Sequence, residues 1–401
     1  MSARELVDSM ITSEAGRRVL FVQFSSSLDG AGLSGLAALN ALRQGGFETF
    51  AVFSRDGPLI KLYELEGHQT KVIEHKNWLR RDGFVNGIRD LLREFERSFK
   101  FVKDIRSVRP SVVYVNTVSS VSAVVAAKLT GVPVVWHLRE LFSDVGGELR
   151  SHPILRFAVR WFVGVVPTAL IANSIAVRNN VLGDRRLGAC RVIYNSVDEG
   201  FLAERRTQAE ARAALSINVK GKLVGIPGTL RPMKGHIFAF RSLKRLLDDG
   251  TVSGILVSGD GTSSYKATLF AEVKRLGIAD VVHFVGVVTD MPAFYRACDV
   301  ICVPSRSEPF GRVVIEAVAT GSAVVASKVG GIIEAADGGQ HAVLVPADDS
   351  DGFMCAVKHS VLNPSLPAEP ESNVLQSFKS RYSSGTYGAD ILAVVRRIVP
   401  E

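Results

Sequence analysis

Short apolar runs that alternate with helical stretches constrain the fold of this chain most strongly. In the first half these runs are VLFVQF, ETFAVF, SVVYVN, VPVVWH, ALIAN and RVIYNS. The pattern stops in a polar stretch near residues 199–221 and restarts with KLVGIPG, GILVSG, VVHFVG, DVICVP, AVVAS and AVLVP. Buried strands separated by helices are typical of parallel sheets covered on both faces. The pattern therefore predicts an α/β protein with two doubly wound domains.

The length of the chain agrees with two domains, because 401 residues exceed the roughly 100 to 200 residues of one ordinary domain. We predict Rossmann-like domains over residues 1–205 and 206–385. A final helix over residues 386–401 is expected to pack back on the first domain. The Pro-rich segment 363–372 is expected to be a surface loop.

Composition excludes several classes of protein. Hydrophobic residues make up 47% and charged residues 22% of the chain, which favours a folded globular protein over a disordered one. The first residues lack the apolar core of a secretory signal, and the apolar stretch 161–172 is shorter than the roughly 20 residues of a membrane-spanning helix. Four cysteines are scattered without a metal or redox spacing. We therefore expect a cytoplasmic protein.

The charge is unevenly distributed. The net charge is +8, and residues 1–200 hold 26 basic against 20 acidic residues. A basic surface attracts nucleic acid, anionic lipid or phosphorylated substrates, but no nucleic-acid motif is present, so we expect no such partner. Residues 150–166 combine basic and aromatic side chains, namely Arg150, Arg156, Arg160, Phe157, Trp161 and Phe162. This amphipathic segment either lies on an anionic membrane at its inner face or packs on the sheet, and both alternatives stay open.

The segment SRSEPFGRVVIEAVATG, residues 305–321, lies between two predicted strands and must contain a crossover helix that ends at Gly321. The N-terminus of this helix faces the ligand-binding edge of the sheet. Backbone N–H groups near Phe310, Gly311 and Arg312 would there favour a phosphate group.

Two acids flank this helix start, Glu308 before it and Glu316 inside it. A nucleotide sugar is anionic in the middle and rich in hydroxyls at both ends. Glu316 would accept hydrogen bonds from its ribose and Glu308 from its sugar. The alternative is an ordinary loop acid and a solvated helix acid. GTLRPMKGH, residues 228–236, adds Arg231 and Lys234 as cations for a diphosphate, or else forms a solvated basic turn.

The first domain contributes two further candidates. LDGAGLSG, residues 28–35, follows the first strand and opens a helix, so Gly30 would let the backbone approach a phosphate; simple packing is the alternative. His137 ends the strand run VPVVWH and is predicted to face the cleft between the domains. There it would donate a hydrogen bond to a sugar hydroxyl or position the acceptor. A structurally satisfied histidine is the alternative.

These motifs, in this order, resemble the retaining nucleotide-sugar glycosyltransferases of family four, which have the GT-B fold. The strongest matching pieces are GTLRPMKGH, ILVSGDG, VVHFVGVVTDMPAFYRACDVICVPS, EPFGRVVIE, GSAVVASKVGGIIE and HAVLVPADD. The first-domain pieces LDGAGLSG, VVWHLRE and VIYNSVD match in the expected order. The resemblance extends over most of the chain.

The resemblance implies a donor domain over residues 206–385 and an acceptor-side domain over residues 1–205. It implies roles for five residues: Glu316 binds the nucleotide ribose, Glu308 the donor sugar and Lys234 the diphosphate, Gly30 approaches the phosphates and His137 lies near the sugar. The chain departs from the family at Thr229, where arginine is common and Arg231 would substitute, and at Gly32, where an acid is common.

The implied activity is transfer of a sugar, with retention of configuration, to a glycan, lipid-linked or small-molecule acceptor. No cofactor is expected, and no metal, because we find no Asp-x-Asp at a strand end of the kind that would hold Mg²⁺ on a diphosphate. Two other functions remain open: a GT-B-type nucleotide-sugar epimerase and a non-catalytic nucleotide-sugar-binding protein.

Overall fold

A computed structural model describes residues 17–79, 84–142, 149, 153–183, 189–363 and 373–399. Residues 1–16, which we did not expect to form a secretory signal, lie outside the described residues. The same holds for Arg150 and for all but the first residue of the Pro-rich segment 363–372.

The first domain is built on a seven-stranded sheet in which all adjacent strands pair in parallel, in the order β3-β2-β1-β4-β5-β6-β7. Its strands are β1 (Arg18–Gln23), β2 (Glu48–Phe53), β3 (Gln69–Val72), β4 (Val112–Val115), β5 (Val134–Leu138), β6 (Ala169–Ala172) and β7 (Cys190–Val192). Each predicted run of the first half overlaps one of these strands. No apolar run predicted β3, because this edge strand reads QTKV and is mostly exposed.

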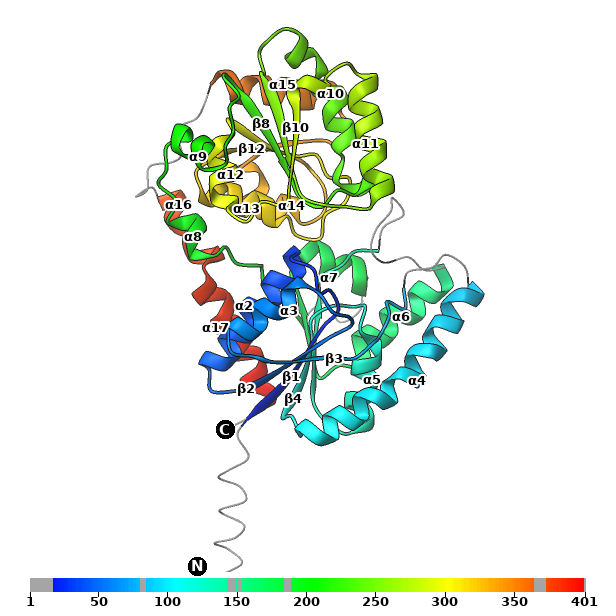
Figure 1. The fold of residues 1–401 in the computed structure, drawn as a ribbon. Helices are drawn as coiled ribbons and strands as arrows, with labels where there is room; N and C mark the ends of the chain where they lie inside the picture. Colours follow the sequence, from blue (N-terminus) through cyan, green and yellow to red (C-terminus); the bar gives the residue numbers. More distant parts are fainter. Residues whose placement is uncertain are drawn as a thin grey trace, which may run out of the picture.

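Helices cover both faces of the first sheet (Figure 1). They are α2 (Gly30–Gln44), α3 (Pro58–Leu65), α4 (Phe84–Val108), α5 (Val121–Leu129), α6 (Pro153–Val165) and α7 (Ile175–Leu182). Apolar side chains of α4, α5, α6 and α7 form one core cluster with the sheet. Those of α2 and α3 form a second cluster on the opposite face. Burial on both faces explains why the strand runs are continuously apolar rather than alternating.

The second domain repeats this plan with a six-stranded parallel sheet in the order β10-β9-β8-β11-β12-β13. Its strands are β8 (Leu223–Pro227), β9 (Gly254–Ser258), β10 (Val282–Gly286), β11 (Val300–Val303), β12 (Ala323–Ser327) and β13 (Val343–Val345). Its helices are α9 (Gln208–Ala214), α10 (His236–Asp248), α11 (Ser263–Arg275), α12 (Met291–Ala297), α13 (Arg312–Ala319), α14 (Ile332–Ala335), α15 (Ser350–Leu362) and α16 (Asn373–Tyr382). A short helix, α8 (Glu199–Leu202), lies between the domains in sequence, and single 3-10 turns cover Pro232–Lys234, Ala279–Val281 and Asp337–Gly339. The two parallel sheets confirm the predicted fold class.

The final helix, α17 (Ser384–Ile398), returns to the first domain and packs beside α2 (Figure 1). Tyr387, Ile391 and Val395 belong to the same core cluster as Leu39 and Leu42 of α2. The last helix in sequence therefore completes one face of the first domain.

Strand order reverses beside the first strand of each sheet. β1 pairs with β2 on one side and β4 on the other, and β8 pairs with β9 and β11. Ligands of open parallel sheets bind at such points, beyond the carboxyl ends of the strands. Gly30 begins the helix that follows β1, while Lys234 and Glu308 lie in the segments that follow β8 and β11.

In the described part of the chain, no helix is both long enough and apolar enough to cross a bilayer.

We predict that Ile391→Ala lowers the free energy of unfolding by about 2 to 5 kcal/mol, because it leaves a cavity at a fully buried core position. Denaturant unfolding measures the change. Arg397→Ala, at an exposed position of the same helix, should change stability by no more than about 0.5 kcal/mol. Equal effects of the two substitutions would contradict the docking of α17.

A second prediction concerns pH. Burial lowers the pKa of His75 and of His236 to about 4. The unfolded chain, with a histidine pKa of about 6.5, then binds protons that the folded chain does not, so stability is complete above that value and is lost as pH falls below it. Urea unfolding should therefore show a loss of about 1 to 1.5 kcal/mol per histidine between about pH 7.5 and about pH 5.5. A constant stability over this range would contradict the burial of neutral histidines.

Candidate active site

The loops after β8 and β11 bring together Lys234 and Glu308, two residues predicted from separate motifs. Lys234 Nζ lies 2.6 Å from Glu308 Oε2, which also accepts a hydrogen bond of 3.3 Å from Ser305 Oγ. Gly235 makes this contact possible: its φ is +73°, and a Cβ at this position would lie 1.9 Å from the carbonyl oxygen of Pro304. Only glycine allows the lysine turn to approach the end of β11 so closely.

Helix α13 begins at Arg312, with Glu308 before it and Glu316 inside it, as predicted. Its N-cap, Gly311, has a φ of +97°, and no side chain caps the helix. Because no described side chain accepts their hydrogen bonds, the first N–H groups of α13 are available for an anion. Phe310 offers only its main chain to an anion at this helix start. Its side chain is packed away, because the residue is 2% exposed and its ring stacks on Tyr194 with 5.7 Å between ring centroids.

Glu316 lies inside α13 and is nearly buried, with 9% of its surface exposed. Its Oε2 accepts a hydrogen bond of 2.7 Å from the hydroxyl of Tyr295, in α12. Its Oε1 lies 2.9 Å from Nη2 of Arg312. Burial and the neighbouring Glu316 raise the pKa of Tyr295 well above its usual value, so the phenol stays protonated and donates.

Arg312 joins this carboxylate to the first domain. Its Nη1 donates to Ser34 Oγ at 3.0 Å and to the carbonyl oxygen of Gly30 at 3.3 Å, and its Nη2 lies 4.0 Å from Asp198 Oδ2. Burial lowers the pKa of Arg312, but the carboxylates of Glu316 and Asp198 outweigh this effect and raise the pKa above its usual value. The predicted residues Gly30, Arg312 and Glu316 are thus brought together.

Arg231 lies at the start of the lysine turn with an exposed side chain. Its carbonyl oxygen accepts the N–H of Lys234 at 3.0 Å, so it helps to shape the turn that presents the lysine.

His137 is the penultimate residue of β5, close to the predicted strand end, but it lies inside the sheet. Its side chain has no exposed surface. Its Nδ1 is 2.7 Å from the hydroxyl of Tyr114 and 3.3 Å from Nη2 of Arg139. Its buried Nε2 has no hydrogen-bond partner among the described residues. Burial and the charge of Arg139 hold the pKa of His137 well below its usual value, so the ring is neutral at pH 7. The structure does not join His137 to Lys234 and Glu308.

Sequence analysis did not predict the contacts of Arg139. The Glu140 carboxylate accepts the main-chain N–H groups of Val118 and Arg139. The guanidinium of Arg139 donates to Asn116 Oδ1, Asn195 Oδ1 and the Tyr387 hydroxyl at 2.7, 2.7 and 2.8 Å. In the sequence, the position of Arg139 directly after a predicted strand was the signal that could have pointed to it. Tyr295 was missed too, although it lies in one of the matching pieces.

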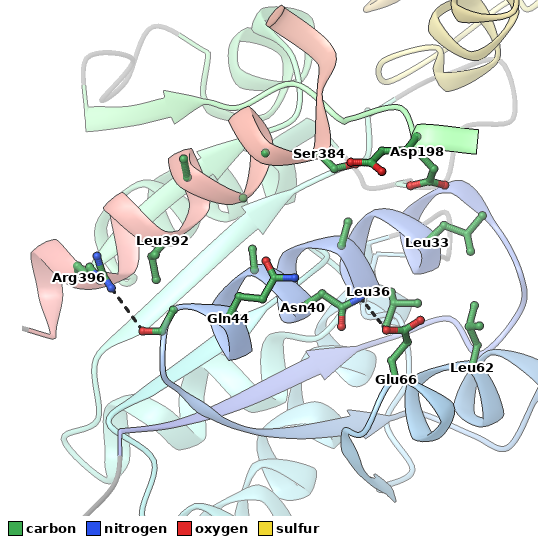
Figure 2. Close-up of a pocket in the computed structure, with 17 residues that line it drawn as sticks. Leu33, Leu36, Asn40, Gln44, Leu62, Glu66, Asp198, Ser384, Leu392 and Arg396 are labelled. Atoms are coloured by element: carbon green, nitrogen blue, oxygen red, sulfur yellow. Dashed lines mark hydrogen bonds between the residues drawn. The ribbon is translucent and has the colours of Figure 1, made fainter. Parts of the chain in front are cut away.

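A groove of about 700 Å³ runs between α2 and α17. Figure 2 shows Leu33 and Leu36 of α2 and Leu392 of α17 along it, Asp198 near one end and Arg396 at the other. None of the nine predicted site residues lines this groove, so it is distinct from the candidate active site. Within the described residues, no group of three or more His, Cys, Asp or Glu side chains is arranged to hold a metal ion.

Solved structures with the same fold include a protein from Anabaena, Alr3699/HepE, in complex with UDP-glucose, and sucrose-phosphate synthase from Thermosynechococcus elongatus. The first has a TM-score of 0.79 and 24% identity and covers 95% of this chain and 99% of its own. The second has a TM-score of 0.74 and 16% identity and covers 95% and 98%. These similarities establish the fold, including the placement of two Rossmann-like domains.

Curated relatives match parts of the chain. A lipopolysaccharide core biosynthesis mannosyltransferase, LpsB, of Rhizobium meliloti is 34% identical over 39% of this chain and 46% of its own length. A D-inositol 3-phosphate glycosyltransferase of Saccharomonospora viridis is 33% identical over 59% of this chain and 58% of its own length. The chain thus spans about half the length of the curated relatives that it matches.

Two family models match successive parts of the chain. The model for glycosyltransferase family 4 matches residues 29–201, which contain Gly30 and His137. The model for glycosyl transferases group 1 matches residues 207–376, which contain Lys234, Glu308 and Glu316. The boundary between the two matches falls where the first sheet has ended and the second has not begun. The chain therefore belongs to the family 4, group 1 glycosyltransferases with the GT-B fold.

Proposed function

We propose that this protein transfers a sugar from a nucleotide-sugar donor to an acceptor, with retention of anomeric configuration and without a metal ion. The observation that carries the proposal is the contact between Lys234 and Glu308, 2.6 Å long, beside the uncapped start of α13. A cation, a helix N-terminus and a carboxylate are there combined at the reversal point of one sheet. This combination suits a diphosphate with a sugar attached to it.

Glu316 is proposed to hold the ribose of the nucleotide. A carboxylate has about four acceptor positions. Tyr295 uses one on Oε2, while Arg312 contacts Oε1 through both Nε, at 3.0 Å, and Nη2, at 2.9 Å. The position left on Oε2 suits a hydroxyl of the ribose diol. Tyr295 and Arg312 would orient the carboxylate for this contact, since each holds a different oxygen.

Lys234 is proposed to stabilise the leaving diphosphate. Its ammonium has three donors, one of which meets Glu308. The others, with the N–H groups near Phe310, Gly311 and Arg312, would stabilise charge that develops as the bond to the phosphate oxygen breaks. Arg231, at the same turn, is proposed to add positive charge from its exposed position.

Glu308 is proposed to accept hydrogen bonds from hydroxyls of the transferred sugar through the oxygen that Lys234 leaves unused. The acceptor oxygen then forms its bond to the anomeric carbon on the face from which the diphosphate departs, and its proton passes to a donor phosphate oxygen. No side chain need act as base in this mechanism. Gly30 would let α2 approach the phosphates. His137 is proposed to serve the sugar or the acceptor through Nε2, which no described residue contacts by a hydrogen bond; this role requires the buried ring to become accessible when substrates bind.

The acceptor is proposed to be a glycan or a lipid-linked or phosphorylated molecule. The excess of basic residues in the first 200 positions favours an anionic acceptor. The mannosyltransferase of lipopolysaccharide core synthesis and the inositol phosphate glycosyltransferase support this class. A peripheral contact of α6 with an anionic membrane is part of the same proposal.

Donor binding is the first prediction of this proposal. Among UDP-, GDP- and ADP-sugars, one nucleotide class should raise the melting temperature, by the equivalent of about 2.7 kcal/mol at one hundred times its Kd. Glu316→Ala and Lys234→Ala should each abolish the shift, because they remove the ribose and diphosphate contacts. Lys244→Ala, which removes an exposed ion pair with Asp248, should keep it. A shift that survives in both site variants would place the nucleotide elsewhere.

Turnover gives the second prediction. Lys234→Ala should lower kcat by about 100- to 1000-fold, since it removes one stabilising donor of the leaving group. NMR of the product should show the anomeric configuration of the donor, and EDTA should leave the rate unchanged. Inverted product, or a rate that EDTA abolishes and Mg²⁺ restores, would refute the proposed mechanism. Epimerised donor formed without any acceptor would instead identify the epimerase alternative.

A further inference from the structure

Helix α4 has two apolar faces, although a helix on the surface of a domain needs only one. Phe101 and Ile105 point into the core and are at most 2% exposed. A second stripe is formed by large apolar side chains spaced four, three and four positions apart, which places them on one side of the helix. Its members are Ile88, Leu92, Phe95 and Phe99, with exposed fractions of 37, 61, 49 and 59%.

The stripe is organised rather than scattered. The rings of Phe95 and Phe99 contact each other edge to face, 5.9 Å apart. Single exposed apolar residues are common on protein surfaces, but a contiguous group marks an interaction site. Leu91, 37% exposed, widens the stripe on one side.

Helix α6 carries a second stripe. Phe157, Trp161 and Val165 follow at intervals of four residues and are 59, 52 and 47% exposed. The opposite sides of α4 and α6 enter the same core cluster, through Phe101 and Val163 among others. Both helices therefore cover the same face of the first sheet (Figure 1), and both stripes point away from that face. We call the two stripes together the α4–α6 surface.

The charges beside the stripe of α4 have mostly one sign. Five basic residues of this helix are exposed, namely Arg89, Arg93, Lys100, Lys103 and Arg106. Of the acids, Glu94 is buried and pairs with Arg97, and Asp104 pairs with Lys71. Asp90 is half-buried and lies 3.9 Å from Arg93. Among the described side chains of α4, Glu96 is the one acid that is exposed. The apolar stripe is thus bordered by an excess of positive charge.

We propose that the α4–α6 surface docks on an anionic lipid bilayer. Aromatic and aliphatic side chains would enter the interface while lysines and arginines meet the phosphate headgroups, the combination by which amphipathic helices bind to membrane surfaces. A second copy of the chain fits less well, because a two-fold contact through α4 would bring its basic borders together. The sequence pointed only to α6, and α4 now supplies the larger part of the surface.

This docking rests on the membrane contact of α6 in the proposed function and extends it to α4, but it requires neither donor nor turnover. The test is sedimentation of the full chain with vesicles of phosphatidylcholine alone and with phosphatidylglycerol added. Binding should require the anionic lipid and should weaken as salt rises. Phe95→Ser combined with Phe99→Ser should raise the Kd at least about tenfold. Both positions are exposed, so folding should be unaffected.

Two further variants complete the test. Leu65→Ser removes an apolar side chain that is 84% exposed on α3, away from the α4–α6 surface, and should bind as the unaltered chain does. Lys100→Glu with Lys103→Glu should weaken binding and reduce its dependence on salt. The proposal is overturned if the chain ignores anionic vesicles or if the phenylalanine variant binds them unchanged. It is also overturned if light scattering shows a dimer that the phenylalanine variant dissociates. Donor-induced stabilisation, measured without vesicles, tests the proposed function separately.

Discussion

The reversal of strand order beside β1 and β8 is the constraint on which the candidate site depends. Right-handed crossovers place the helices that follow neighbouring strands on opposite faces of a sheet, so the loops at a reversal diverge and leave a crevice. Lys234 follows β8 and Glu308 follows β11, and these two strands are neighbours in the sheet. The two residues lie 74 positions apart in sequence. Their contact is therefore a product of topology, and the first domain repeats the geometry at Gly30.

Arg312 then couples the two crevices. A buried guanidinium is costly unless carboxylates and acceptors compensate for its lost hydration. Glu316 and Asp198 supply negative charge, while Gly30 and Ser34 supply acceptors from the other domain. The same cation thus holds the carboxylate proposed for the ribose and the turn proposed for the phosphates. A change in the charge of Glu316 would therefore alter the contacts that Arg312 makes with Gly30 and Ser34 of the first domain.

Much of this arrangement was predictable from sequence because burial on both faces and loop chemistry leave local patterns. The apolar runs located every strand except β3, whose exposed edge position leaves no such run, and the motifs located the loops that carry Lys234 and Glu308. Side-chain contacts across the fold were not predictable. Tyr295 reaches Glu316 only because α12 packs beside α13, and His137 was placed at the correct strand end without the knowledge that it points toward Tyr114. Local sequence specifies backbone position better than the direction or partners of a side chain.

The return of α17 to the first domain has a consequence for the site itself. The hydroxyl of Tyr387 accepts a hydrogen bond from Arg139 and donates one to the carbonyl oxygen of Ser34. Arg312 holds the hydroxyl of the same serine from the second domain. The turn that begins α2 is therefore fixed from both sides, by the last helix of the chain and by the helix that carries Glu316. Because satisfied buried networks are rigid, α17 helps to set the position of the backbone that we propose to face the phosphates, without any need to touch a ligand.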